Sequence, residues 1–291
     1  MRPKIAPYLF IAPFFIMFIV FFVGPIFYGI WLSLNKVVLI GKKMDFVSIK
    51  NYANLFSNPM FYQSLKVTML FTLGHGSTHL LMALGAALIL NLKLKGRIFF
   101  RSAFFLPVIT SLVVAALIWR LLLDSHLGLV NMGLRKLGLP GNYRWLDSPQ
   151  LALFSIIIID NWRWFGFQMV ILLAGLQNIP AELYEAAKID GANPFQIIWY
   201  ITLPLLFPVI FFCMVIIMIG SFQLFAEPFV LTQGQGGPAN STLSVALYLY
   251  QSAFQYFKIG YSAALGYVLS IIIMGFALFQ MRVLGRRAGL R

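Results

Sequence analysis

The sequence predicts an all-α integral membrane protein with about six transmembrane helices, from its composition and from its long apolar runs. Of the 291 residues, 60% are hydrophobic and only 10% are charged, and the mean hydropathy is +0.87. A soluble domain is roughly half apolar. A helix of about 20 apolar residues crosses a bilayer core of about 30 Å. The runs are continuous and lack the apolar–polar alternation of a membrane barrel, so helices are expected.

Six spans are placed on these runs. The first follows Arg2 and Lys4 as a secretory signal would, but it exceeds the usual core of about 7–15 residues and ends in no small-residue cleavage site. An uncleaved span is therefore expected there. With no internal repeat and no low-complexity linker, the chain 1–291 is expected to form one transmembrane domain with spans at 8–34, 64–91, 102–123, 151–176, 205–230 and 260–283.

Charge and cysteine content exclude several classes. The net charge is +14, but most Lys and Arg residues flank the apolar runs and no nucleic-acid-binding motif occurs, so the expected partner is the lipid bilayer and not nucleic acid. Cys213 is the single cysteine, which rules out a disulfide within one chain, and it is expected to serve packing. The short basic link at 93–101 favours an orientation with both termini inside, although 36–50 and 135–144 are also basic.

The link between the fourth and fifth spans, 177–204, is too polar to cross a bilayer. Pro180 suits a first helical turn, Glu182 and Glu185 suit the positive end of a short helix, and Gly191 suits its stop. Asn193, followed by Pro194 and Gln196, has the pattern of a second helix start. These signals predict two short helices meeting at Gly191, with Pro204 and Pro208 marking the turn into the fifth span.

This link resembles a known family. Its triplet Glu185-Ala186-Ala187, the pair Asp190-Gly191, and Ile201, Leu203 and Pro204 match the EAA motif of binding-protein-dependent ATP-binding-cassette (ABC) import permeases. Other segments are similar to the carbohydrate and glycerol-phosphate (maltose-type) branch, and the N-terminal span is similar to the first of its two paired permeases. These segments are 99–107, 128–131, 145–146, 160–164 and 236–238.

The resemblance implies partners and a location. The elbow would be a coupling helix docked on a cytoplasmic ATPase, with Glu185 as its charged contact, in a multi-pass protein of the bacterial inner membrane with both termini cytoplasmic. The partners implied are a second homologous permease, two ATP-binding-cassette ATPases and an extracytoplasmic solute-binding protein. The chain has no GxxxxGK[ST] loop, so it is not expected to be an enzyme, and ATP and Mg would bind at the ATPases, with no cofactor on this chain.

Polar residues at membrane depth are the candidates for solute contact, because such residues usually face a bundle interior or a cavity. Asp160 and Arg163 share a helix face beside aromatic rings that could stack on a sugar; a structural ion pair near the interface is the alternative. Gln223 and Glu227, four apart, could line the pathway or bond between helices. The set is Asp160, Trp162, Arg163, Trp164, Gln168, Gln223 and Glu227.

His75 and His79 are four apart in the second span, a spacing that permits metal binding. They have no acidic or cysteine neighbour in sequence, so packing or a pore-lining role is preferred and no metal is expected. The function hypothesis is an ATP-driven importer that moves a disaccharide, oligosaccharide, polyol or glycerol phosphodiester by alternating access. The alternatives are an ion-coupled secondary transporter and an intramembrane enzyme that uses Asp160 or Glu227.

Overall fold

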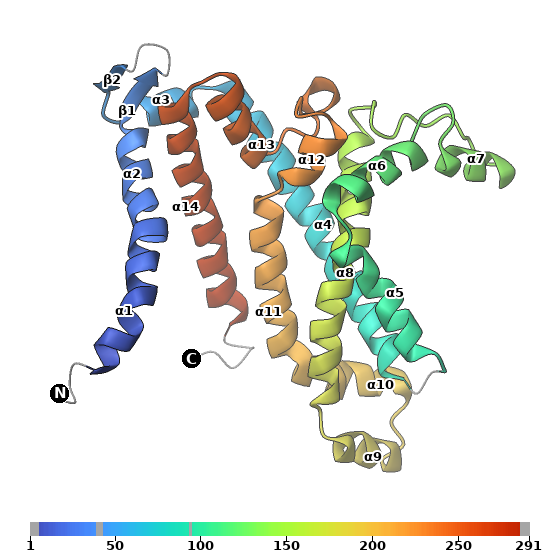
Figure 1. Cartoon of the computed structure of the whole chain (residues 1–291). Coiled ribbons are helices and arrows are strands. Elements are labelled where there is room, and N and C mark those ends of the chain that lie inside the picture. Colours follow the sequence, from blue (N-terminus) through green and yellow to red (C-terminus); the bar gives the residue numbers. More distant parts are fainter. Residues whose placement is uncertain (1–5, 39–42, 93–94, 286–291) are drawn as a thin grey trace. The chain divides into compact units, whose positions relative to one another are not determined.

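Helices make up most of the computed structural model, which describes residues 6–38, 43–92 and 95–285 (Figure 1). Contacts divide the chain into a first unit, residues 1–61 with 248–271, and a second unit, residues 62–247 with 272–291. Each unit is described by itself. The expectation of a single domain stays a prediction.

The first unit begins with a long apolar helix. It runs from α1 (Ala6–Phe18) through a π-helical turn (Ile19–Val23) into α2 (Gly24–Ser33). Strands β1 (Asn35–Val38) and β2 (Lys43–Phe46) form an antiparallel pair in which Asn35 lies opposite Phe46. Helix α3 (Lys50–Phe56) follows. None of the side chains in the most apolar stretch of Tyr8–Ser33 is buried in the protein, as expected for a helix that meets lipid or another chain.

Two further helices complete the first unit: the end of α13 (Val245–Tyr250), continued by a π-helical turn (Gln251–Gln255), and the first half of α14 (Ile259–Leu284). Helix α14 begins against the hairpin, because a Cβ atom at Gly260 would overlap the carbonyl oxygen of Asn35. The side chain of Asn51 ties α3 to the same place by donating to the carbonyl oxygens of Ser33 and Asn35, at 2.8 and 3.0 Å.

The second unit is built around α4, α8 and α11. The buried residues of its main apolar cluster come from these three helices and include Cys213, which is a packing residue. Helix α5 crosses α8 closely, since a Cβ at Gly166 would overlap the backbone of Phe104. The helices are α4 (Pro59–Asn91), α5 (Arg97–Ile109), α6 (Leu112–Leu122), α7 (Leu129–Lys136), α8 (Ala152–Gln177), α9 (Ala181–Ile189), α10 (Pro194–Ile197), α11 (Leu203–Phe222) and α12 (Ala226–Leu231).

Five helical stretches of the described chain are long and apolar enough to cross a membrane: Tyr8–Ser33, Pro59–Asn91, Ala152–Gln177, Pro194–Leu231 and Ile259–Leu284. The predicted third span, 102–123, is not one straight helix. Helices α5 and α6 meet at an angle of 101° across Thr110 and Ser111, and counting this bent pair gives six spans. Pro107 explains the weak point, because it removes a backbone donor near the end of α5.

The predicted fifth span, 205–230, is also interrupted. Helix α11 ends at Phe222 and α12 begins at Ala226, with non-helical backbone at Phe225. The interruption brings backbone out of the helix beside the buried polar residues described below. Non-helical backbone at membrane depth is tolerated where protein or a water-filled cavity surrounds it.

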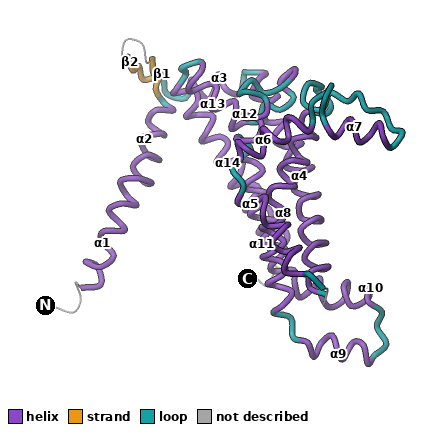
Figure 2. The backbone as a smooth tube through the Cα atoms, turned by 45° about the vertical axis from the view of Figure 1, so that its right-hand side comes forward, coloured by secondary structure: helices purple, strands orange, loops and turns teal. Residues whose placement is uncertain are grey.

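Within the second unit, the connections gather at two opposite ends (Figure 2). Helices α9 and α10 lie at one end, together with the last turn of α4 and the first turn of α5. Helices α7 and α12 lie at the other end. The link 177–204 therefore lies at the opposite end of α8 and α11 from the break at 223–225.

Candidate functional site

The link 177–204 forms the elbow that its sequence predicts. Helix α9 ends at Ile189 with Asp190 as its C-cap, and Gly191 follows with a φ of +79°, a left-handed conformation that favours glycine. At the start of α10, the side chain of Asn193 accepts from the amide of Gln196 at 2.9 Å, and the side chain of Gln196 accepts from the amide of Asn193 at 2.8 Å. This reciprocal cap fixes the direction in which the second helix leaves the bend.

The elbow displays its side chains to the surroundings. Glu185, Ala186 and Asp190 are exposed, whereas Ala187 is buried. Several large apolar side chains are also exposed, among them Ile189 and Tyr200 at 87% and 78%. A hollow of about 320 Å³ lies inside the bend and is lined by Asp190, Gly191, Ala192, Gln196, Ile197, Tyr200 and Ile201. This surface combines charge, small residues and apolar side chains, as a docking surface does.

The entry into α11 differs from the expectation. Pro204 and Pro208 were expected to mark the turn, but Pro208 lies inside α11 and the irregularity is a π-helical turn at Ile198–Thr202. The turn comes earlier because a proline disturbs the preceding turn, where its missing N–H and its ring conflict with the carbonyl four residues back. Leu203 and Ile201 are half-buried and Pro204 is exposed.

A cavity of about 450 Å³ lies among α4, α8, α11 and α12. Six of the seven predicted solute-contact residues line it: Asp160, Arg163, Trp164, Gln168, Gln223 and Glu227. Phe167, His75 and His79 line it as well. Trp162 does not, because its ring packs edge-on against Trp119 of α6 with 5.6 Å between the centroids. The geometry thus places Trp162 in a helix contact, whereas the solute contacts of the other six stay predictions.

The charged residues of the cavity are paired, but not with the partners that the sequence suggested. Asp160 and Arg163 lie on one face of α8 as expected, yet they do not form an ion pair with each other. Asp160 Oδ2 lies 3.0 Å from His75 Nε2, and Arg163 Nη1 donates to Glu227 Oε1 at 3.1 Å. The guanidinium of Arg163 also lies over the ring of Trp164, 4.8 Å from its centroid. Each pair therefore joins α8 to a different element.

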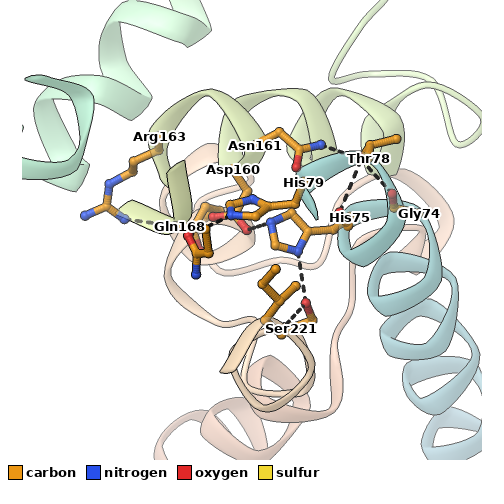
Figure 3. Close-up of polar contacts among 11 residues, drawn as sticks. Gly74, His75, Thr78, His79, Asp160, Asn161, Arg163, Gln168 and Ser221 are labelled. Atoms are coloured by element: carbon orange, nitrogen blue, oxygen red, sulfur yellow. Dashed lines mark hydrogen bonds and ion pairs between the residues drawn. The ribbon is translucent and has the colours of Figure 1, made fainter. Parts of the chain in front are cut away.

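Neutral polar residues extend this network (Figure 3). His75 Nδ1 lies 2.9 Å from Ser221 Oγ, and His79 Nε2 lies 2.9 Å from Gln168 Oε1. Asn161 Nδ2 donates to Thr78 Oγ1 at 2.7 Å. Sequence reasoning missed Ser221, Asn161 and Thr78. Their depth inside apolar runs was a usable signal for all three, although a serine within a helix often bonds only its own backbone.

Gln223 and Glu227 reach the cavity for a reason other than the predicted one. They were placed four apart on one face of a continuous fifth span, but the break after Phe222 separates them. Gln223 follows the last turn of α11 and is exposed, while Glu227 lies in the first turn of α12 and is buried. The break, and not helical periodicity, brings the carboxylate to Arg163.

The cavity can hold a polar molecule, but it is not arranged for the other chemistries considered. In the described chain, no group of three or more His, Cys, Asp and Glu residues could hold a metal ion. Ser221, His75 and Asp160 lie in a row like a hydrolase triad, but Ser221 Oγ donates to the carbonyl oxygen of Ile217 at 2.7 Å. Because that hydroxyl proton points away from His75, the serine is not set up as a nucleophile.

Three buried polar atoms of the cavity residues have no hydrogen-bond partner in the part of the chain that the structure describes: His75 Nε2, which has only its ion-pair contact with Asp160, His79 Nδ1 and Arg163 Nε. A buried polar atom without a partner costs about 1–3 kcal/mol. The rings of Trp164 and Phe167 are 36% and 38% exposed at the same cavity. Accessible aromatic faces beside polar side chains are a combination that suits a polar ligand with an apolar face.

The chain is similar to known proteins along nearly its whole length. The family model described as "Binding-protein-dependent transport system inner membrane component" matches residues 3–288. The arabinooligosaccharides transport system permease protein AraP of Bacillus subtilis (strain 168) is 40% identical over 289 residues, which are 98% of this chain and 90% of that protein. The lactose transport system permease protein LacF of Rhizobium radiobacter is 37% identical over 276 residues, 94% of this chain and 92% of that protein.

A solved structure shares the fold. The crystal structure of a bacterial ABC transporter involved in the import of the acidic polysaccharide alginate contains a chain that matches with a TM-score of 0.84 and 24% identity, covering 97% of this chain and 95% of that one. The resemblance found in the sequence is thereby confirmed. The chain belongs to the family of binding-protein-dependent transport system inner membrane components.

Proposed function

We propose that this permease carries a sugar or similar small polar solute through an ATP-driven importer, with the cavity as its solute contact and the elbow as its attachment to the ATPase. One observation supports this most directly. The elbow joins the two helices that supply most of the cavity, since α8 carries Asp160, Arg163 and Gln168 and α11 carries Ser221. A displacement of the elbow is therefore passed directly to the walls of the cavity.

The solute class follows from the groups that face the cavity and is supported by the relatives. The exposed side chain of Gln223 offers an amide to hydroxyl groups, and Trp164 and Phe167 offer faces for stacking on a sugar ring. Relatives are described as permeases for arabinooligosaccharides and for lactose. Disaccharides, oligosaccharides, polyols and glycerol phosphodiesters are the candidate solutes.

The partners are a second homologous permease, two ATPases that bind ATP and Mg, and an extracytoplasmic solute-binding protein. Support comes from the family, whose description includes a binding protein, and from a solved relative described in complex with an alginate-bound periplasmic protein. The chain has no phosphate-binding loop of its own, so the partner ATPases would hydrolyse ATP. When the ATPases close on ATP, they would move the elbows. The cavity would then change from opening on one side of the membrane to opening on the other.

The elbow would face the cytoplasm of a bacterial cell, with the protein in the inner membrane and both termini inside. The start of α5 lies at the elbow end of the second unit and is rich in positive charge: Lys95 precedes the helix, and Arg97 and Arg101 lie in its first turns. Short links dense in Lys and Arg favour the cytoplasmic side. This orientation would place α7 and α12 toward the binding protein.

The test compares two glutamates one turn apart on α9. Glu185 belongs to the EAA motif and Glu182 does not, and both are exposed. In proteoliposomes that contain the complete transporter, we expect Glu185→Lys to assemble but to lose at least about 90% of solute uptake while ATP hydrolysis continues, because a reversed charge misplaces the docked elbow. The control Glu182→Lys should keep most of the uptake.

Two results would contradict the proposal. Normal uptake per ATP hydrolysed by Glu185→Lys would remove the elbow from the coupling mechanism. Uptake that needs no ATPase and collapses with an ion gradient would favour an ion-coupled secondary transporter instead.

A further inference from the structure

The charges that face the cavity come from few residues, so their balance can be worked out. The titratable or charged residues that line it are His75 and His79 from α4, Asp160 and Arg163 from α8, and Glu227 from α12. Helix α11 adds none. In a buried cavity the charge balance decides which solutes can enter, because an ion loses its hydration there unless an opposite charge compensates it.

One pair is compensated within the protein. Arg163 and Glu227 are joined at 3.1 Å, and the side chain of Glu227 is only 8% exposed. A carboxylate this buried needs its cation. The positive charge of Arg163 is therefore compensated by Glu227.

The proton on the second pair follows from donor and acceptor capacities. Ser221 has one hydroxyl proton, and it donates to the carbonyl oxygen of Ile217, which can only accept. His75 Nδ1, at 2.9 Å from Ser221 Oγ, must therefore carry a proton and donate it. The remaining contact, 3.0 Å between His75 Nε2 and Asp160 Oδ2, then requires one more proton between the two atoms.

This pair is neutral wherever that proton resides. If Asp160 holds it, both groups are uncharged, and if His75 holds it, an imidazolium faces a carboxylate. His79 faces Gln168 Oε1 through Nε2 and is 1% exposed with no acidic partner of its own, so it is buried as the uncharged imidazole. The cavity as a whole then has no uncompensated charge, and loss of the shared proton would make it negative.

We infer that this permease selects uncharged carbohydrates and polyols and excludes anionic solutes such as uronate oligosaccharides and glycerol phosphates. The inference rests on the proposed function, in which the cavity holds the transported solute. An anion would find no free cation in the cavity and would lose its hydration without compensation. This narrows the candidate solutes to the neutral ones.

The experiment compares alditols with aldonates, which are both open-chain at the reducing end and differ there in a hydroxymethyl group or a carboxylate. The complete transporter is placed in nanodiscs without the binding protein, and equilibrium dialysis at pH 7 compares the alditols of lactose, arabinotriose and maltotriose with the aldonates of the same sugars. We expect at least one alditol to bind about tenfold or more tightly than the matching aldonate. An aldonate that binds as tightly as the matching alditol overturns the inference but leaves the importer function standing. Binding of none of the six overturns the assignment of the cavity to sugars, on which the inference rests.

Two variants test the charge balance itself. Glu227→Gln frees the positive charge of Arg163, so the preference should move toward the aldonate by about tenfold, or about 1.4 kcal/mol. Glu182→Gln, on the elbow, is the matched control for loss of one carboxylate and should leave the preference unchanged. An unchanged preference in Glu227→Gln would show that the charge balance of the cavity does not decide solute choice and would overturn the inference.

Discussion

The elbow and the cavity lie at opposite ends of the same two helices, and their charges are handled in opposite ways. The only two ion pairs in the described chain are at the cavity, Asp160 with His75 and Arg163 with Glu227. On the elbow, Glu182, Glu185 and Asp190 are exposed, and none of them takes part in an ion pair there. The cavity is electrostatically complete within one chain, whereas the elbow is not.

This difference separates what each region needs. A buried charge without its partner is costly, so the cavity must carry its own compensation through every conformational step. An exposed charge is solvated and contributes about 0–1 kcal/mol to an ion pair. The elbow can therefore keep its charges and its apolar side chains for a partner at little cost to its own stability. Substitutions in the two regions should accordingly differ in what they damage, with stability at risk in the cavity and coupling at the elbow.

The largest effect is expected at the buried pair. Arg163→Met leaves Glu227 buried without a cation and should lower the free energy of unfolding by about 3–5 kcal/mol. The double variant Arg163→Met with Glu227→Met removes both charges and should recover most of that loss. Denaturant unfolding of the purified protein in detergent measures both.

Glu185→Met on the elbow is the control for that experiment, and it should change the free energy of unfolding by less than about 1 kcal/mol. An Arg163→Met variant that is as stable as the unchanged protein would contradict the difference between the two regions. The buried charges of the cavity would then depend on their partners no more than the exposed charges of the elbow do.

The elbow could be predicted from the sequence because its signals are local. Gly191 stops a helix by its own backbone conformation, and Asn193 and Gln196 cap each other across three residues. No distant residue is needed for either signal. What the sequence did not show there was the π-helical turn at Ile198–Thr202, because the apolar run continues through it without interruption.

The cavity could be predicted only in part, for the opposite reason. Its residues stood out as polar groups at membrane depth, but their pairing depends on which helices pack together. Arg163 and Glu227 are 64 positions apart, and His79 and Gln168 are 89 apart. The nearer pair, Asp160 and Arg163, was suggested by helical spacing and does not form. The break after Phe222, which brings Glu227 to Arg163, has no strong signal in the residues around it.

A smaller effect is expected at the bend of the elbow. It tests whether coupling at the elbow can be reduced while solute binding in the cavity stays unchanged. Gly191 has a φ of +79° with nothing close to an added Cβ, so Gly191→Ala is opposed by backbone conformation alone, at about 1–2 kcal/mol. We expect less solute uptake per ATP hydrolysed and unchanged sugar binding. Gly133→Ala, where φ is not positive and an added Cβ also meets nothing, is the control and should leave both measurements unchanged. Weaker sugar binding in Gly191→Ala would mean that the two regions are not separable.

The smallest effect is expected at the cap of the second elbow helix. Asn193→Ala removes both the side-chain acceptor and its half of the reciprocal cap, at about 1 kcal/mol. Hydrogen exchange of the amide of Gln196 should therefore speed up about fivefold, because that amide loses its only acceptor seen in the described chain. Gln196→Ala removes only the return bond to the amide of Asn193 and should have a weaker effect on α10. Exchange in α8 beside the cavity should not change in either variant, because the cap has no contact with the buried pairs. Faster exchange in α8 would show that the loss of the cap alters the structure beside the cavity. The two ends of α8 and α11 would then be mechanically coupled even through the weakest element of the elbow.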